Sequence, residues 1–326
     1  MRASKLSERM IARLYPVGDG KSVLYSSFRD RFLPISVKIQ MRKTLDTVAV
    51  IFDFDETLMP DSTSALLAKH GIDVEKFWTE QAKALIDQGY DQAHAYLRLI
   101  LENVGPEKPL GNLTNTDLSK FGAELDCYYP GVITMFEDLR QIVNAVSSDL
   151  RLEFYIISGG LQDLVQGTKI AREFSAIYGC TLDEDADGKC IKWIKRCITF
   201  TEKTRYLFEI NKGIRPSDVL NHHCAVNTSV AEDRRRVPFK NMIYVGDGLT
   251  DIPCFSLLKK HGGYGYGVFD PSQQKSAKKA LEEFMRADRV LSVYPPDFQA
   301  MSGLGAMLRI TVQTVANSIV LSQKRS

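Results

Sequence analysis

Cysteines are few in this 326-residue chain, and they form no paired motif. The six of them, at positions 127, 180, 190, 197, 224 and 254, include no C-x-x-C pair and do not reach the density of a disulfide-stabilised small domain. The pattern therefore predicts reduced thiols in a cytoplasmic protein. His222, His223 and Cys224 have no second pair at ligand spacing, so they do not predict a zinc site.

Long apolar runs are also missing. No stretch of 18 uncharged apolar residues occurs, so we expect no membrane span. The segment from Met301 to Leu321 comes nearest, but it contains Arg309, Gln313 and Asn317. We therefore expect residues 296–326 to form an amphipathic helix packed on the body of the protein.

A strong net charge is absent. The formal net charge is +2, which gives no global field for binding nucleic acid, and we expect no nucleic-acid partner. The charge is uneven, since residues 1–45 contain ten Lys and Arg against three Asp and Glu. This basic extension is either a solvated or docking segment or a targeting or anion-binding segment. No apolar region follows its start, so a secretory signal is not expected.

What the chain does contain is an alternation of apolar strands and amphipathic helices. Buried strands are predicted at Thr47–Phe52, Leu152–Ile157 and Met242–Val245, with shorter ones at Tyr264–Phe269 and Asp288–Val293. Helical spacing of apolar residues predicts helices at Ser62–Lys69, Val74–Gln88, Gln92–Asn103 and Val132–Val146. Residues 177–200 are predicted to form a β-hairpin, and residues 216–238 an irregular segment. The fold class is therefore α/β, with a doubly wound, Rossmann-like parallel sheet.

Three of these strands end on polar side chains. Asp53 and Asp55 follow the first strand, Ser158 follows the second, and Asp247 with Asp251 follows the third. In an open parallel sheet, ligands bind beyond the carboxyl ends of the strands. Four carboxylates gathered there require a cation, and oxygen ligands of this kind suit Mg²⁺.

The remaining polar groups point to a phosphoryl ligand for that cation. The hydroxyl of Ser158 can donate a hydrogen bond, and Gly159 lets its N–H approach a ligand at the start of a helix. A helix capped by Thr201 can present Lys203 to the same point. Of the paired carboxylates, one can attack phosphorus, and the other can protonate the leaving oxygen and then deprotonate water.

Four motifs resemble those of the haloacid dehalogenase superfamily, on its phosphoserine-phosphatase-like side. They are D-F-D-E-T at 53–57, I-S-G-G at 157–160, Lys203, and G-D-G-L-T-D at 246–251, and the resemblance covers roughly residues 46–293. Dehalogenases lack the second carboxylate of the first motif. Asp55 therefore favours phosphate chemistry.

The resemblance implies a role for each residue. Asp53 would be the nucleophile, Asp55 the acid/base, and both would ligate Mg²⁺ together with Asp247, Asp55 through its backbone carbonyl. Ser158 and Lys203 would hold the phosphoryl group. Thr57 would shape the first loop, and Asp251 would support the site from behind. Lys212 and Lys240 remain competitors for the place of Lys203.

The resemblance also implies a domain plan. Residues 46–60 and 129–295 would form the α/β core, residues 61–128 a helical cap, and residues 1–45 and 296–326 lie outside it. These outer segments are open to docking on the core, to self-association as a homo-oligomer, or to partner contact. Ser62 stands where phosphoserine phosphatases have a cap glutamate for the substrate amine, and Thr250 stands where they have asparagine, which argues against phosphoserine as the substrate.

The leading functional hypothesis is a Mg²⁺-dependent phosphomonoesterase that acts on a small phosphorylated metabolite. A phosphotransferase or mutase with the same intermediate and a non-catalytic binding protein are the alternatives. A dinucleotide-binding dehydrogenase is a weaker one, because Gly263, Gly265 and Gly267 do not form G-x-G-x-x-G.

Overall fold

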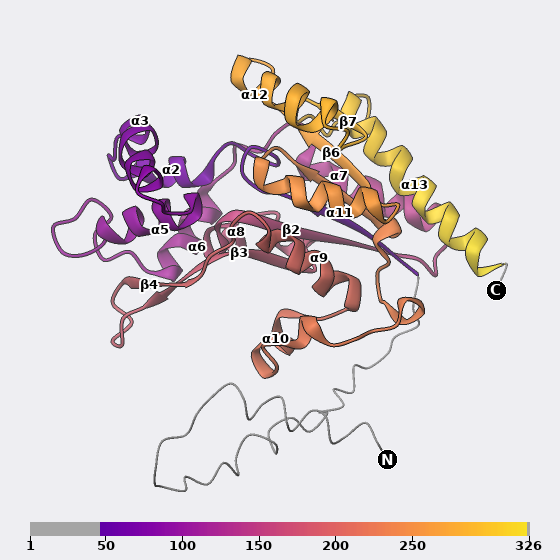
Figure 1. Ribbon diagram of the computed structural model, residues 1–326, viewed down its shortest axis with the longest axis horizontal. Helices are drawn as coiled ribbons and strands as arrows, with labels where there is room; N and C mark the ends of the chain where they lie inside the picture. The colour runs from indigo at the N-terminus through magenta and orange to yellow at the C-terminus, as the bar shows by residue number, and fades with distance from the viewer. Residues whose placement is uncertain (1–45, 325–326) are drawn as a thin grey trace, which may run out of the picture. The chain divides into compact units, whose positions relative to one another are not determined.

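A seven-stranded sheet forms the centre of the protein in the computed structural model, which describes residues 46–324 (Figure 1). The strand order is β4-β3-β2-β1-β5-β6-β7. All neighbouring strands are parallel except β3 and β4, which are antiparallel. The strands are β1 Thr47–Phe52, β2 Arg151–Leu161, β3 Ala176–Glu184, β4 Ile191–Arg196, β5 Met242–Gly246, β6 Tyr264–Val268 and β7 Ser292–Tyr294. The α/β fold class is confirmed, whereas the basic extension 1–45 lies outside the described residues.

The central strand β1 is buried along its whole length, as its unbroken apolar sequence predicts. Phe52, its last residue, pairs with Ile156 of β2 on one side and with Val245 of β5 on the other. The carboxyl ends of these three strands therefore lie side by side. This register places the polar residues that follow β1 and β5, and those near the end of β2, at one edge of the sheet.

Two pairs of helices cover the sheet. On one face, α7 (Val132–Val146) packs against β2 and against α13 (Gly303–Gln323). Helix α13 also contacts β1 and β7. α9 (Glu202–Lys212) and α11 (Ile252–Lys260) pack together on the other face (Figure 1). The smaller elements are α8 (Gln162–Gly167), α10 (Pro216–Asn221) and α12 (Gln274–Lys279).

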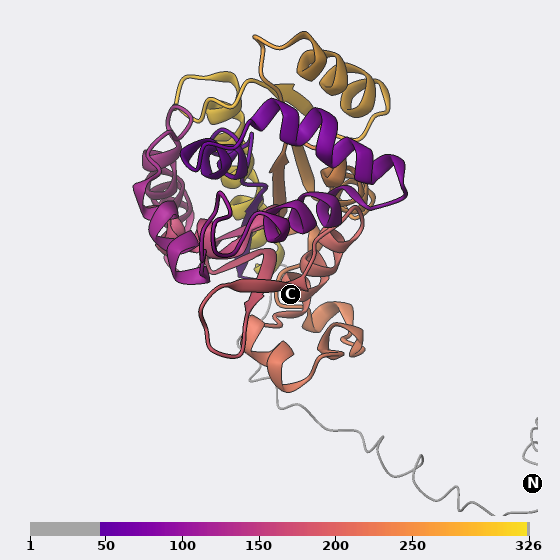
Figure 2. The same ribbon diagram turned by 90° about the vertical axis from the view of Figure 1, so that its left-hand side faces the viewer.

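The chain between β1 and α7 is helical, as expected. It comprises α2 Ser62–Lys69, α3 Val74–Lys76, a π-helical stretch Phe77–Ala82, α4 Lys83–Asp87, α5 Gln92–Glu102 and α6 Asn115–Glu124. Figure 2 views the molecule from this side and shows these indigo and purple helices in front of the sheet. The last of them, α6, packs closely on α8, which follows β2.

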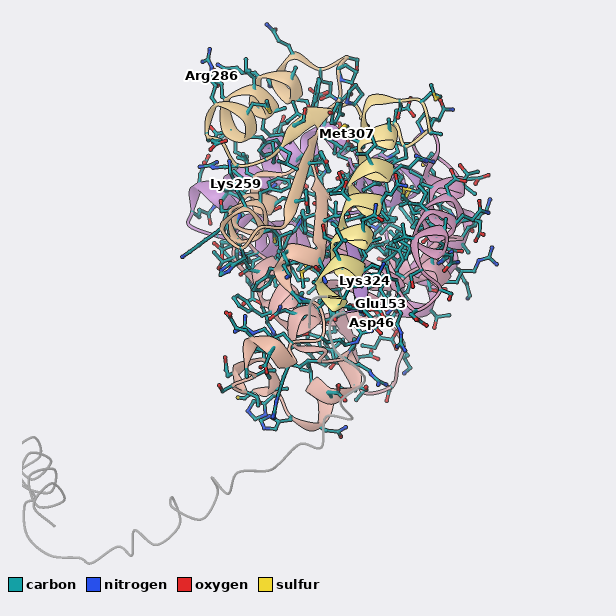
Figure 3. The ribbon with its side chains drawn as sticks, turned by 90° about the vertical axis from the view of Figure 1, so that its right-hand side faces the viewer. Asp46, Glu153, Lys259, Arg286, Met307 and Lys324 are labelled. Atoms are coloured by element: carbon teal, nitrogen blue, oxygen red, sulfur yellow. The ribbon has the colours of Figure 1, made fainter. Side chains whose placement is uncertain are left out.

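Helix α13 is the C-terminal helix that the sequence predicts. By length and composition alone it could cross a membrane, and 44% of its most apolar window is buried inside the protein. Its buried side chains include Leu304, Leu308, Val312 and Val315. Figure 3 shows the helix lying along the body of the protein between Met307 and Lys324. The packing supports the expectation of a helix docked on the core.

Some local expectations are wrong. Strand β2 continues through Ser158, Gly159 and Gly160, because Leu161 still pairs with Cys180 of β3. Thr201 stands before α9, but its side chain makes no capping hydrogen bond. The last strand, β7, begins only at Ser292, after a turn in which Asp288 has a positive φ of 53°. The irregular segment 216–238 contains the short helix α10.

Candidate active site

The polar ends of three neighbouring strands line one cavity of about 270 Å³. The core contributes Asp53, Asp55, Ser158, Gly159, Gly160, Asp247, Gly248 and Thr250 to its wall. The helical segment between β1 and α7, called the insertion below, contributes Asp61, Thr63, Trp78, Gln92, Ala93 and Tyr96. The segment after β4 contributes Ile198, Thr199 and Phe200. The cavity therefore lies between the carboxyl edge of the sheet and the insertion, where a ligand of an open parallel sheet is expected.

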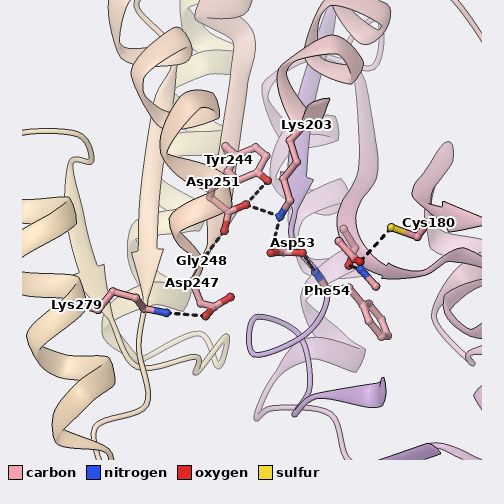
Figure 4. A network of polar contacts seen from close by, with 12 residues as sticks. Asp53, Phe54, Cys180, Lys203, Tyr244, Asp247, Gly248, Asp251 and Lys279 are labelled. Carbon is pink, nitrogen blue, oxygen red and sulfur yellow. Dashed lines mark hydrogen bonds and ion pairs between the residues drawn. The ribbon is translucent and has the colours of Figure 1, made fainter. Parts of the chain in front are cut away.

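Lys203 links Asp53, which follows β1, to Asp251, which lies after β5. Its ammonium, which is fully buried, donates to Asp53 Oδ2 and to Asp251 Oδ1 at 2.7 Å each (Figure 4). Burial alone would lower the pKa of Lys203, but the carboxylates of Asp251 and Asp53 raise it. The residue therefore stays cationic and fixes the position of both aspartates.

Lys212 and Lys240 do not take this place. The ammonium of Lys212 donates to the backbone carbonyls of Val226 and Thr228, and Lys240 is exposed. Among the three candidate lysines, the structure therefore brings only Lys203 to the strand ends.

The side chain of Asp251 accepts three hydrogen bonds. Its Oδ1 accepts hydrogen bonds from Lys203 and from the Tyr244 hydroxyl, the latter at 2.7 Å, and its Oδ2 accepts one from the Gly248 N–H at 2.8 Å. The side chain is fully buried. With both oxygens engaged, Asp251 is suited to hold Lys203 and the loop in place.

Asp53, Asp247 and Asp251 form the one group of metal-ligand side chains found in residues 46–324. One oxygen of each lies within 4.8 Å of the others. Three hard oxygen donors of this kind fit Mg²⁺, which prefers carboxylates and water. The side chain of Asp55 is not in this group, and its Oδ1 accepts from the N–H of Ser62 at 2.8 Å. Ligation of a metal by the backbone carbonyl of Asp55 stays a prediction.

The electrostatics of this group also favour a bound cation. Burial raises the pKa of Asp53 well above its usual range; the ammonium of Lys203 opposes this, and the carboxylates of Asp251 and Asp247 add to it. Burial raises the pKa of Asp247 to about 6, although Lys279 acts against it. A divalent cation would keep both carboxylates ionised near neutral pH.

Asp55 has the properties of a proton donor and acceptor near pH 7. Burial, followed by the charge of Asp61, raises its pKa to about 7. An acid/base group works best when its pKa is close to the operating pH. Asp55 also lies against the backbone of Gly160, where an added Cβ would meet its Oδ2 at 2.4 Å.

Ser158 lies inside the site, but its surroundings differ from those expected. It is buried in strand β2, and its Oγ accepts a hydrogen bond from the N–H of Gly160 at 2.9 Å. Gly159 also belongs to this strand, so its N–H is not at a helix start. Thr57 is buried as well, and its hydroxyl has no partner among residues 46–324.

Several residues at the site were not predicted from the sequence. Lys279 of α12 donates to Asp247 Oδ2 at 3.0 Å (Figure 4). Glu56 has a left-handed φ of 56°, which is strained for a residue with a side chain, and its carboxylate accepts from the N–H of Asp61 and the hydroxyl of Tyr129. Nothing in the spacing of Lys279 could have revealed it, but Glu56 stands directly inside the first motif.

No family model matches the chain. The chain is 29% identical over 267 residues to an uncharacterized protein from Borreliella burgdorferi, and the match covers 74% of this chain and 90% of that protein.

Solved structures match at lower sequence identity. A HAD-family hydrolase from Salmonella enterica serovar Typhi is 14% identical with a TM-score of 0.48, and the match covers 78% of this chain and 69% of that one. A probable phosphoserine phosphatase from Vibrio cholerae is 15% identical with a TM-score of 0.49, and the match covers 87% of this chain and 69% of that one. These likenesses concern the fold alone.

Proposed function

We propose that this chain is a Mg²⁺-dependent phosphomonoesterase that forms an aspartyl-phosphate on Asp53. The observation that carries the proposal is the buried Lys203, which fixes Asp53 and Asp251 at 2.7 Å beside Asp247. A nucleophilic carboxylate, a fixed ammonium beside it and nearby hard oxygen donors are the parts that phosphoryl transfer needs.

The residues would divide the reaction between them. Asp53, Asp247 and the backbone carbonyl of Asp55 would hold Mg²⁺, which when bound neutralises phosphoryl charge. An oxygen of Asp53 attacks phosphorus and breaks its bond to the leaving oxygen, while Asp55 gives that oxygen its proton. Ser158 and Lys203 hold the phosphoryl group.

In the second half of the reaction the phosphoryl group leaves Asp53. Asp55, now ionised, takes a proton from the attacking water, and hydrolysis of the acyl phosphate returns Asp53 and releases inorganic phosphate. A pKa near 7 lets Asp55 serve both halves.

We infer that residues 61–128 act as the cap over a core made of residues 46–60 and 129–295. The support is that six residues between Asp61 and Tyr96 line the same cavity as the strand ends. A cavity of about 270 Å³ can take a small phosphorylated molecule. A closed lid would also exclude bulk water from the acyl phosphate.

The test is phosphate release from an aryl phosphate, with and without Mg²⁺, by the wild type and by Asp53→Asn. We expect turnover that needs the metal and disappears in the variant, whose fold is checked by circular dichroism. Equal turnover in both proteins would refute the nucleophile. A metal-loaded wild type that releases phosphate only when an alcohol acceptor is added, with the ester of that alcohol as product, would establish the phosphotransferase instead.

A further inference from the structure

A single peptide unit connects the helical insertion to the serine of the site. The carbonyl of Gly159 accepts a hydrogen bond from the Tyr96 hydroxyl at 2.6 Å and another from the Cys180 thiol at 3.2 Å. The N–H of Gly160 lies at the other end of the same rigid peptide plane, and it donates to Ser158 Oγ at 2.9 Å. The orientation of the carbonyl therefore sets the orientation of the N–H.

This N–H controls what Ser158 can do. Because Oγ accepts from Gly160, its own proton is directed elsewhere, and the structure gives that proton no acceptor within residues 46–324. Ser158 is 1% exposed and lines the cavity. Its O–H is thus available to a ligand oxygen only while the Gly159–Gly160 peptide keeps its present orientation.

Tyr96 is well placed to fix that orientation. It belongs to α5 of the insertion, is 6% exposed and packs against Trp78, with ring centroids 5.8 Å apart. Burial raises the pKa of its hydroxyl, so the group stays protonated and keeps donating in neutral solution. Cys180 is the second donor, but a thiol is a weak one, and Tyr96 makes the shorter contact.

We propose that Tyr96 is a positioning residue, which orients the Gly159–Gly160 peptide and thereby the Ser158 hydroxyl, and so links docking of the insertion to phosphate binding. The inference rests on the proposed function, since it assigns Ser158 to a phosphoryl oxygen. It predicts that Tyr96 acts through Ser158 and not through the metal.

A double-mutant cycle tests this prediction. Tyr96→Phe removes only the hydroxyl and keeps the ring packing. We expect it to lower kcat/KM by about tenfold and to weaken inhibition by inorganic phosphate by a similar factor, the effect of one lost buried hydrogen bond. In a Ser158→Ala background the same change should cost less than about twofold, because coupled residues are not additive.

Two further readouts separate positioning from a general structural role. The Mg²⁺ concentration for half-maximal activity should stay the same in Tyr96→Phe. The matched control is Tyr90→Phe, which removes an exposed hydroxyl that accepts from Arg98 outside the cavity, and it should leave kcat/KM unchanged. A full tenfold loss from Tyr96→Phe in the Ser158→Ala background would overturn the inference.

The result also distinguishes this inference from the proposed function. A wild type that turns over normally, with an unaffected Tyr96→Phe variant, would overturn the role of Tyr96 and leave the phosphatase intact. A wild type that neither releases nor binds phosphate would overturn both.

Discussion

The two glycines after Ser158 differ in what surrounds them. A Cβ on Gly160 would lie 2.4 Å from Asp55 Oδ2, whereas the nearest atom to a Cβ on Gly159 is the Ile198 carbonyl oxygen at 3.9 Å. The first is a steric overlap, and the second is an ordinary contact. Two glycines that look equivalent in the sequence therefore have different reasons to be glycine.

We predict that Gly160→Ala lowers kcat/KM by about 100-fold, because displacing the carboxylate of Asp55, the proposed acid/base, by about 1 Å would misalign it. Gly159→Ala should cost far less. The measurement is steady-state hydrolysis of an aryl phosphate by both variants, with their folding checked by circular dichroism. Equal losses would show that Asp55 is not where the structure has it.

The raised pKa of Asp55 predicts a pH-dependent effect on stability. Burial moves this pKa from the ordinary value of 3.8 to about 7 in the folded protein. The folded state then holds the proton more tightly than the unfolded chain, so stability falls as pH rises from about 4 to about 7. A shift of three pKa units corresponds to about 4 kcal/mol. We expect about half of that, because Asp55 is partly exposed.

Asp55→Asn should therefore stabilise the metal-free protein by about 2 kcal/mol at pH 8, and the gain should approach zero at pH 4. Urea unfolding in EDTA at both pH values measures this. The control is Asp87→Asn, an exposed aspartate paired with Lys83, which should change stability by less than about 1 kcal/mol at both pH values. A gain from Asp55→Asn that is equal at both pH values would contradict the raised pKa.

The residues that could be predicted are those that share a strand end. Asp53 and Asp247 follow apolar strands and Ser158 lies near the end of another, and the rule for parallel sheets places strand ends together. Lys279 and Tyr96 could not be predicted, because each reaches the site from a helix whose packing depends on tertiary contacts. The side-chain direction of Asp55 was likewise set by the N–H of Ser62.

At the scale of elements, local pattern and tertiary pairing compete. Helices Ser62–Lys69 and Val132–Val146 begin and end where their apolar spacing predicts. Strand β2 runs on through two glycines, which have low strand propensity, because neighbouring β3 extends its pairing to Leu161. The sequence of α6 does not predict that this helix packs on α8, because their close backbone contact depends on a glycine in each helix.

Helices α6 and α8 cross at close range. A Cβ on Gly122 of α6 would lie 2.0 Å from the Leu164 carbonyl oxygen, and one on Gly167 of α8 would lie 1.9 Å from that of Ser119. The two helices thus touch backbone to backbone. This end of the insertion is fixed to the core, whereas its other helices carry the cavity wall.

We predict that Gly122→Ala lowers the free energy of unfolding by about 2–3 kcal/mol, because the backbones must separate. Lys120→Ala, on the exposed side of the same helix, should change it by less than about 0.5 kcal/mol. Denaturant unfolding of both variants measures this. If Gly122→Ala were as stable as the wild type, α6 would not be docked on α8 in solution.

At the scale of the whole molecule, the packing of α13 shows whether the C-terminal segment is part of the folded core. Leu308 is fully buried, whereas Ile310, two residues on, is 55% exposed. If the helix is part of the folded body, Leu308→Ala should cost about 2–5 kcal/mol and Ile310→Ala about 0.5 kcal/mol or less. Thermal and denaturant unfolding compare the two. Equal, small effects would show that the helix does not pack as described.

The proposed metal site would also act on the whole molecule, because Asp53 and Asp247 follow β1 and β5 at the centre of the sheet. A cation that binds only the folded state, present at about 100 times its Kd, stabilises it by about 2.7 kcal/mol. For a domain of this size, we expect Mg²⁺ to raise Tm by about 5–10 °C.

Asp247→Asn should remove most of that rise, while the exposed control Asp87→Asn should keep it. Thermal unfolding with Mg²⁺ and with EDTA measures the effect without any substrate, so the result does not depend on the proposed activity. The metal-free Asp247→Asn variant should itself be no less stable than the wild type, because it loses a buried carboxylate with a raised pKa. A full Mg²⁺-induced rise in Asp247→Asn would place the metal away from the Asp53–Asp247–Asp251 group.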